Sequence, residues 1–299
     1  MSIHSIHAAR ACALALVLSA TGAASAAPVY ASAPGGDAFT NAGTSNQGQA
    51  IGASNWYYNN VRSGGQAGIG TQYPRNGNGA ATLAGPANAK ADIEYLPNAV
   101  NVGGNFAGTT SMGTFSSLSA LSYDWYRSSA STAASHLHPA LRVLLDLDGN
   151  LATTGDRGGL VYEFVYNGGA VGTAVATDQW VSTAVTGTTK LWNFGLGIGT
   201  AANINGTPYP YDATLAEWQR YAPDAAIIGF SAGIGSGWGP FSGAVDNIAW
   251  TIGGESATSN FEVRAAANAV PEPGSAALAI AALLGAAATV RRARRTARA

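Results

Sequence analysis

Apolar and polar residues alternate over several stretches in the middle of the chain, and turn-forming residues separate these stretches. The clearest is 114–128, where Leu121, Tyr123 and Trp125 share one face and the residues between them share the other. This period of two predicts a β-strand that buries one face. Apolar and aromatic runs bounded by Gly, Asn, Asp or Pro predict further strands at 55–61, 79–85, 90–96, 137–150, 158–169, 189–195, 225–238, 243–254 and 258–265.

One segment, 212–223, has the pattern of a helix. Leu215 and Trp218 lie three residues apart on one face, Asp212 can cap the first turn, and Pro223 ends the segment. Among the strands, we expect 79–85 to pair with 90–96 and 258–265 to close a sheet edge. Residues 27–50 are expected to form a loose leader that contributes one early strand.

Many short strands with a single short helix indicate an all-β fold. Strands and helices do not alternate, which argues against a parallel α/β sheet. We therefore predict an antiparallel, two-sheet, jelly-roll-like sandwich over residues 27–269. A signal helix is expected before this body and an apolar helix after it.

The first 26 residues have the pattern of a secretory signal peptide. Arg10 precedes an apolar run at 11–18, and Ala24-Ser25-Ala26 forms a cleavage site for signal peptidase. Cys12, the one cysteine of the chain, lies inside this segment. The exported chain is therefore expected to form no disulfide.

Residues 270–299 have three parts in a fixed order. Val270, Pro271, Glu272 and Pro273 come first, followed by the uncharged stretch 274–290. That stretch is 17 residues long, the lower limit for crossing a bilayer as a helix. A basic cluster follows at Arg291, Arg292, Arg294 and Arg295. By the positive-inside rule this end stays cytoplasmic and the body lies across the membrane.

This tail resembles the PEP-CTERM sorting signal. The resemblance implies recognition by an exosortase-type transpeptidase in a Gram-negative bacterium, usually one that secretes exopolysaccharide. The protein would be exported and held transiently in the inner membrane. After cleavage near the Pro-Glu-Pro motif it would pass to the cell surface or the extracellular matrix.

The body is mildly acidic once both ends are removed. Residues 27–270 contain nine basic and fifteen acidic side chains, a net charge of −6. No basic patch is evident, so nucleic acid is not an expected partner. An acidic balance is compatible with a divalent cation.

Two segments are candidates for a structural calcium ion. Asp146, Asp148 and Asp156 surround the turn between the strands predicted at 137–150 and 158–169, and they either ligate a cation or serve as turn residues. The glycine and glutamate positions of an EF-hand are missing. Residues 241–248 resemble the closing strand of carbohydrate-binding jelly-roll modules, which implies that Asp246 is a calcium ligand. The alternative is an Asp-Asn pair facing solvent at an edge.

Aromatic residues offer flat faces on which sugar rings stack. The candidates are Trp56, Tyr58, Trp125, Trp192 and Trp238, most of which would otherwise belong to the core. His136 and His138 have the spacing of two ligands on one strand, but a catalytic zinc needs a third ligand, and loop histidines are the favoured interpretation.

No motif for nucleophilic catalysis is present in the sequence. A glycosidase needs two facing carboxylates, and the residues available for such a pair are Glu94, Glu163, Asp124 and Asp146. The sequence therefore favours a non-catalytic, exported protein associated with exopolysaccharide. The alternatives are a secreted polysaccharide hydrolase or lyase, and an adhesive matrix protein without a small ligand.

Overall fold

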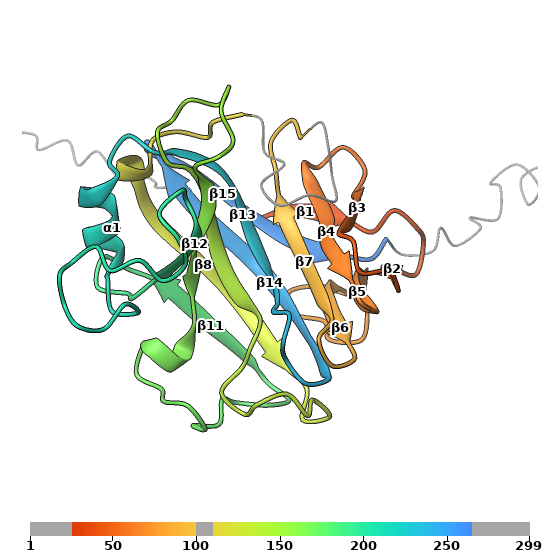
Figure 1. The fold of residues 1–299 in the computed structure, drawn as a ribbon. Helices are drawn as coiled ribbons and strands as arrows, with labels where there is room; N and C mark the ends of the chain where they lie inside the picture. The colour runs from red at the N-terminus through yellow and green to blue at the C-terminus, as the bar shows by residue number, and fades with distance from the viewer. Residues whose placement is uncertain (1–25, 100–109, 265–299) are drawn as a thin grey trace, which may run out of the picture.

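The computed structural model describes residues 26–99 and 110–264. The described chain forms two β-sheets with one α-helix, which confirms the predicted β-sandwich (Figure 1). Residues 1–25 of the signal peptide, the Val270–Pro273 motif, the 274–290 stretch and the arginine cluster lie outside the described residues. Within 26–99 and 110–264, no helix combines the length and apolar character needed to cross a membrane.

The eight-stranded sheet is built around a long central strand, β14. On one side β14 pairs with β8 along most of its length, and β8 pairs with β11 at the edge. On its other side β14 pairs first with β6 and then with β15. The bounds are β1 Ala27–Tyr30, β2 Asp37–Asn41, β5 Gly65–Gly70, β6 Ala80–Gly85, β8 Leu118–Arg127, β11 Trp180–Val185, β14 Phe241–Ile252 and β15 Glu255–Glu262.

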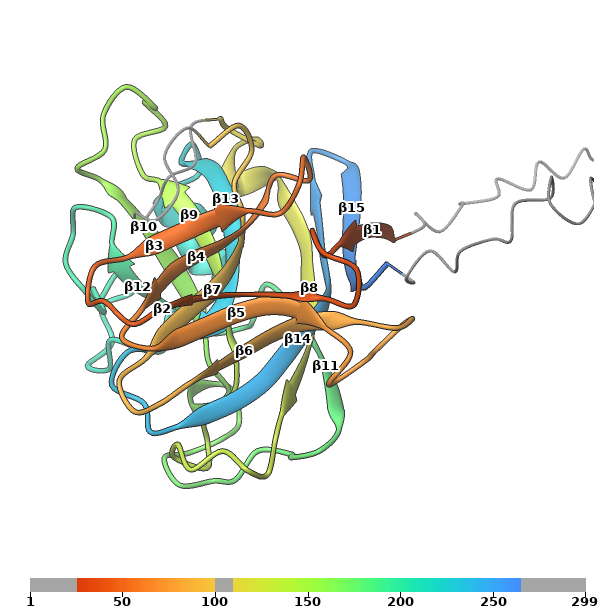
Figure 2. The same ribbon diagram turned by 90° about the vertical axis from the view of Figure 1, so that its right-hand side faces the viewer.

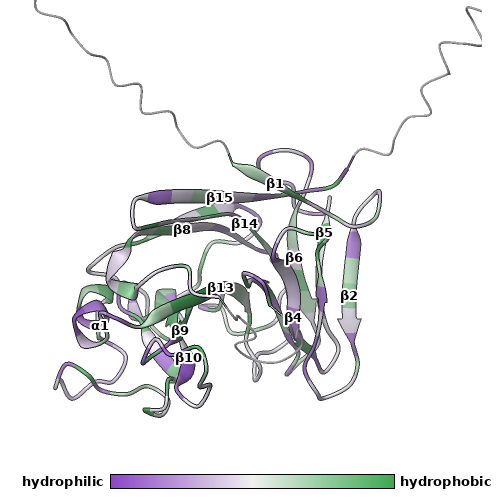
Figure 3. Cartoon of the chain, turned by 90° about the horizontal axis from the view of Figure 1, so that it is seen from above, coloured by the Kyte–Doolittle hydropathy of each residue, from purple (hydrophilic) through white to green (hydrophobic). Residues whose placement is uncertain are grey.

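The seven-stranded sheet has the order β12-β10-β9-β13-β7-β4-β3 and is antiparallel throughout. Figure 3 shows β9, β10 and β13 of this sheet in one layer and β8 and β14 of the other sheet in the second. The bounds are β3 Gln47–Ala50, β4 Trp56–Arg62, β7 Lys90–Tyr95, β9 Ala140–Asp146, β10 Arg157–Tyr162, β12 Trp192–Gly195 and β13 Ala226–Ile234.

The main core fills the space between the sheets with aromatic rings. Trp56 lies at its centre, and its ring centroid is 5.0 Å from that of Phe261 and 5.4 Å from that of Tyr95. A smaller apolar cluster lies on the outer face of the seven-stranded sheet around Leu144 and Ile228. The seven-stranded sheet therefore has side chains packed on both faces.

Three expectations about the strands were wrong. The strands at 80–85 and 90–95, β6 and β7, lie in different sheets and do not pair. The final strand, β15, is not an edge, because it pairs with β14 on one side and in parallel with β1 on the other (Figure 2). Residues 27–50 contribute three strands rather than one. The parallel β1–β15 pair is an exception to the antiparallel arrangement that we predicted.

The predicted helix is α1, Leu215–Tyr221, at the end of the sandwich remote from β2 and β3 (Figure 1). Its cap is Thr214 rather than Asp212. The Thr214 hydroxyl accepts from the Glu217 amide, and the Glu217 carboxylate accepts from the Thr214 amide. This reciprocal pair satisfies two amides that the first turn leaves free, so the helix begins later than predicted. Two short 3₁₀ helices, Phe115–Ser117 and Phe164–Tyr166, complete the described elements.

Candidate functional site

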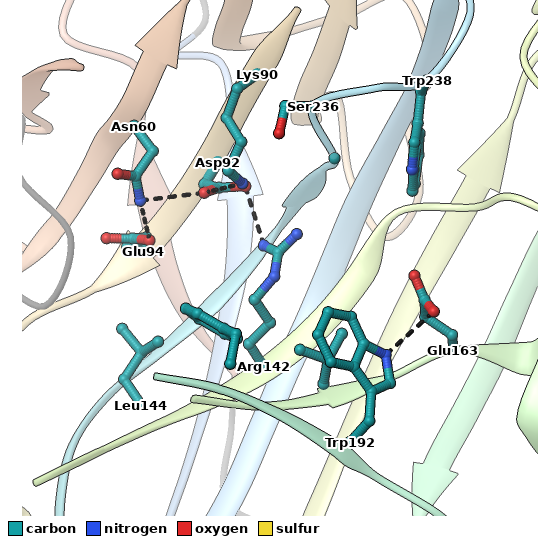
Figure 4. A pocket seen from close by; sticks show the side chains of 13 residues that line it. Asn60, Lys90, Asp92, Glu94, Arg142, Leu144, Glu163, Trp192, Ser236 and Trp238 are labelled. Atoms are coloured by element: carbon teal, nitrogen blue, oxygen red, sulfur yellow. Dashed lines mark hydrogen bonds and ion pairs between the residues drawn. The ribbon is translucent and has the colours of Figure 1, made fainter. Parts of the chain in front are cut away.

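A cavity of about 270 Å³ opens on the outer face of the seven-stranded sheet (Figure 4). Four strands of this sheet, β4, β7, β9 and β12, supply most of its side chains, and the loop that follows β13 covers one side. The polar lining residues are Asn60, Lys90, Asp92, Glu94, Arg142, Glu163 and Ser236. Strand periodicity explains the grouping, because alternate residues of one strand point to the same face.

Asp92 is the centre of the hydrogen-bond network on the cavity floor. Its carboxylate accepts from Lys90 Nζ at 2.6 Å and from Arg142 Nη1 at 3.0 Å. It also accepts from Asn60 Nδ2 at 3.2 Å. Asp92 is 1% exposed and Arg142 is 8% exposed, so these charges are held within the protein rather than at its surface. Burial and the neighbouring Arg142 lower the pKa of Lys90 to about 8.

A glycine on the adjacent strand makes room for this network. Gly233 of β13 lies opposite Asp92 of β7 in the strand register. A Cβ atom at residue 233 would lie 1.9 Å from Asp92 Oδ1 and 2.5 Å from the carbonyl oxygen of Ala91. Because neither approach is sterically allowed, any larger residue at 233 would displace Asp92 from the cavity floor.

Glu94 adds a second carboxylate to the floor. Its oxygens accept from Asn59 Nδ2 at 2.6 Å and Asn60 Nδ2 at 2.9 Å. Burial, followed by the nearby charge of Asp92, raises the pKa of Glu94 to about 7. Near neutral pH this group therefore exists in both protonated and ionised forms, and it can donate or accept a hydrogen bond.

Replacing Glu94 by glutamine is expected to flatten the pH dependence of stability. The folded state holds the Glu94 proton more tightly than the unfolded state, whose pKa is 4.5. The wild-type protein therefore loses stability as the pH rises from about 4.5 to 7, by about 3 kcal/mol from this group. Urea unfolding of both proteins at pH 5, 6, 7 and 8 measures the difference. Parallel curves for the two proteins would contradict this assignment.

Tryptophan side chains form the walls of the cavity. Trp192 on β12 is half-buried and donates from Nε1 to Glu163 Oε2 at 3.1 Å. Trp238, also half-buried, lies in the loop after β13. Burial raises the pKa of Glu163. Figure 4 shows Arg142 between Glu94 on one side and the Trp192–Glu163 pair on the other. The cavity thus combines indole faces with charged and amide hydrogen-bonding groups.

Three of the five aromatic residues predicted to stack on sugars belong to the core instead. Trp56 and Tyr58 are each 1% exposed, and Trp125 is 4% exposed. Trp56 donates to Ser259 Oγ, Tyr58 donates to Asp37, and the ring of Trp125 stacks on His138. Their faces are already covered by protein, so the stacking assignment of these three residues was wrong. The structure places Trp192 and Trp238 in one cavity.

The loop that joins β9 to β10 brings Asp146, Asp148 and Asp156 together. One carboxylate oxygen of each lies within 4.8 Å of those of the other two. Asp246 is not part of this group. It lies on β14 of the other sheet, between the part of β14 that pairs with β6 and the part that pairs with β15.

Asp246 is fully buried, so the alternative of an Asp-Asn pair facing solvent is wrong for this residue. Its Oδ1 accepts from the Phe261 amide at 2.9 Å, while Oδ2 has no hydrogen-bond partner in the described chain. Burial raises the pKa of Asp246 to about 7. A protonated Asp246 or a bound cation would each relieve the cost of this buried carboxylate.

The two histidines have separate protein partners. His138 is buried beside Tyr123, its Nε2 accepts from the Phe164 amide at 3.1 Å, and burial lowers its pKa to about 4. His136 Nδ1 accepts from the Gly172 amide at 3.3 Å. In the described ranges, neither joins a group of three metal-ligating side chains.

Of the four carboxylates considered for a catalytic pair, Glu94 and Glu163 line the same cavity. Asp124 pairs with Arg75, and Asp146, the last residue of β9, pairs with Arg157. The sequence analysis missed Asp92, Arg142, Asn60 and Lys90. A signal for the β7 residues was available, because Lys90, Asp92 and Glu94 alternate with apolar residues and so predict a polar strand face.

Comparison with known proteins assigns no family to the chain. No family model matches the sequence, and no curated protein is significantly similar to it. One similar solved structure is of a protein studied for the promiscuous specificity of carbohydrate-binding modules from the β-sandwich superfamily. The match covers 73% of this chain at 13% identity with a TM-score of 0.30. This chain spans 57% of the length of that protein.

Proposed function

We propose that this protein is an exported, non-catalytic polysaccharide-binding protein whose sugar site is the cavity on the seven-stranded sheet. The observation that carries the proposal is the combination of a buried ionic floor, centred on Asp92 and Arg142, with the indole side chains of Trp192 and Trp238. Sugars carry hydroxyl groups around apolar ring faces. They therefore suit a site that offers hydrogen bonds from below and aromatic surface from the side.

The arrangement of charges favours binding of a polar, uncharged sugar ring. Both cations of the floor pair with Asp92, and two further carboxyl groups, Glu94 and Glu163, line the same cavity, so positive charge is not in excess for an anionic ligand. The carboxylates and amides remain able to exchange hydrogen bonds with hydroxyl groups. Because the floor groups are bonded to one another before a ligand arrives, little ordering is required on binding.

Replacing Trp192 by alanine is expected to weaken polysaccharide binding at least tenfold, about 1.4 kcal/mol, because a cavity wall that a sugar can contact is removed. The measurement is titration calorimetry or affinity electrophoresis of the full-length protein. The probes are soluble bacterial exopolysaccharides, both neutral and uronic-acid-containing. Trp180→Ala is the matched control, since Trp180 is also half-buried but lies on β11 of the other sheet.

The binding proposal is contradicted if no polysaccharide binds the wild-type protein. It is also contradicted if the Trp192→Ala and Trp180→Ala variants bind equally well. Absence of any sugar binding would favour the third class, an adhesive matrix protein without a small ligand.

A second candidate function, a hydrolase or lyase, rests on the presence of Glu94 and Glu163 in one cavity. Their placement argues against a glycosidase pair. Strands β13 and β9 separate β7 from β10, and Glu163 directly follows β10, so the two backbones lie about 14 Å apart at about 4.8 Å per strand. Glycosidase carboxylates lie about 5–9.5 Å apart. Arg142 also lies between the two carboxyl groups (Figure 4). Release of reducing or unsaturated sugar ends by the wild-type protein, lost in Glu163→Gln, would nevertheless establish this alternative.

Export and sorting complete the proposal, and both rest on the sequence. The signal peptide at 1–26 would direct the chain out of the cytoplasm, and the 270–299 tail would hold it in the inner membrane for an exosortase-type transpeptidase. The cleaved body would then reach the cell surface or the matrix, where its polysaccharide ligand is found. Comparing the mature mass in cells with and without the transpeptidase tests this part separately from sugar binding.

A further inference from the structure

We propose that the loop joining β9 to β10, residues 147–156, binds a calcium ion through the carboxylates of Asp146, Asp148 and Asp156. The convergence of these three groups carries the proposal, since one oxygen of each lies within 4.8 Å of those of the others. The site is separate from the sugar cavity and does not depend on the proposed function.

Strand pairing and loop hydrogen bonds hold the three carboxylates together. Asp146 is the last residue of β9 and pairs with Arg157, the first residue of β10. Asp156 therefore lies next to the strand end, and its Oδ2 accepts from the Asp148 amide at 2.8 Å. The ligand positions are thus set by the hairpin itself, which lowers the ordering cost of binding a cation.

A buried oxygen without a hydrogen-bond donor gives an independent reason to expect a ligand. Asp146 is 0% exposed, and its Oδ2 accepts from Arg157 Nε at 2.9 Å. Its Oδ1 is also buried and has no hydrogen-bond partner in the described chain. An oxygen removed from water without a donor destabilises the fold, so a cation bound here would supply the missing contact.

Charge and donor type point to calcium. The three carboxylates and the Arg157 guanidinium together leave two negative charges uncompensated, which matches one divalent cation. The cluster contains oxygen donors and neither histidine nor cysteine, which disfavours zinc and copper. Calcium takes six to eight oxygens in flexible geometry, and backbone carbonyls and water can complete the shell in a loop. Magnesium requires a stricter octahedron.

The test uses the full-length protein after removal of metal with a chelator. Calcium at a hundredfold excess over its Kd is expected to raise the melting temperature by about 5–10 °C. Asp148→Asn and Asp156→Asn should each weaken calcium binding in calorimetry at least tenfold and remove this rise. Asp146 is left intact, because its loss would remove the carboxylate that pairs with the buried Arg157 and would destabilise the fold for a reason unrelated to calcium. Asp178→Asn, which alters an exposed aspartate in another loop, and Asp246→Asn are the controls and should keep the full effect.

Hydrogen exchange of the wild-type protein gives a second readout that requires no variant. Calcium should slow exchange of the amides in 147–156. The proposal is overturned if the wild-type protein binds no calcium, or if Asp148→Asn and Asp156→Asn bind it as the wild type does. Loss of binding in Asp246→Asn with retention in the loop variants would overturn it as well and would place the ion in the other sheet.

Discussion

Replacing Asp92 by alanine is expected to destabilise the protein by about 3–5 kcal/mol, because it leaves the buried Arg142 and the half-buried Lys90 without their shared carboxylate. The Lys90 ammonium and the Arg142 guanidinium both donate to the Asp92 carboxylate, which is 1% exposed. Folded domains have about 5–15 kcal/mol of stability in total, so the loss is a large fraction. Urea unfolding at pH 7, followed by tryptophan fluorescence, measures it.

Two comparisons test whether charge is the cause. Glu255→Ala removes an exposed carboxylate at the start of β15 and should change stability by about 0.5 kcal/mol or less. Asp92 raises the pKa of Lys90, which is about 8 in the wild type, so Lys90 of the variant loses its proton at a lower pH. The Asp92→Ala penalty should therefore shrink as the pH rises toward 8, because a neutral Lys90 no longer repels Arg142. A loss below about 1 kcal/mol at pH 7 would show that this network adds little to stability.

Trp56→Ala is expected to cost about 3–5 kcal/mol of stability through lost packing. Trp56 is 1% exposed, with ring contacts to Phe261 and Tyr95 and a hydrogen bond from Nε1 to Ser259 Oγ at 3.0 Å. Alanine would open a cavity between the two sheets and remove the ring contacts that Phe261 and Tyr95 make with Trp56. Thermal and urea unfolding both report the change.

Variants of Trp56 and Trp192 distinguish a core residue from a ligand-binding residue, because one should change stability and the other sugar binding. Trp56→Phe keeps an aromatic ring in the core and should lose less stability than Trp56→Ala. Trp192→Ala should weaken sugar binding at least tenfold and lose less stability than Trp56→Ala, because Trp192 is only half-buried. If Trp56→Ala were as stable as the wild type and failed to bind sugar, Trp56 would contact the sugar, as predicted from the sequence, and its assignment to the core would be wrong.

The sequence predicted strands well where side chains alternate and poorly where glycine replaces them. No strand was predicted at residues 65–70, where three of the six residues are glycine, yet these residues form β5. A Cβ atom at Gly65 would lie 1.9 Å from the Lys90 carbonyl oxygen, and one at Gly68 would lie 2.1 Å from the Asp37 carbonyl oxygen. These glycines permit a close approach of backbones, which no pattern of hydrophobicity records.

The candidate site was less predictable than the fold because its residues are far apart in sequence. Asp92 and Arg142 are 50 residues apart, and β13, from later in the chain, lies between their strands. Period-two alternation indicates which residues of a strand share a face, but not which strands are neighbours. For the same reason the sequence did not distinguish Trp192, at the cavity, from Trp56, in the core.

The parallel pairing of β1 with β15 has a mechanical consequence. Ala27 pairs with Ser259 and Tyr30 with Glu262. The N-terminal end of β1 and the C-terminal end of β15 therefore lie at opposite ends of the strand pair. Tension applied at Ala27 and Glu262 therefore acts along the strands in opposite directions and loads their hydrogen bonds together, in shear, rather than one after another. A body stretched between its two ends would resist opening where the first and last strands meet.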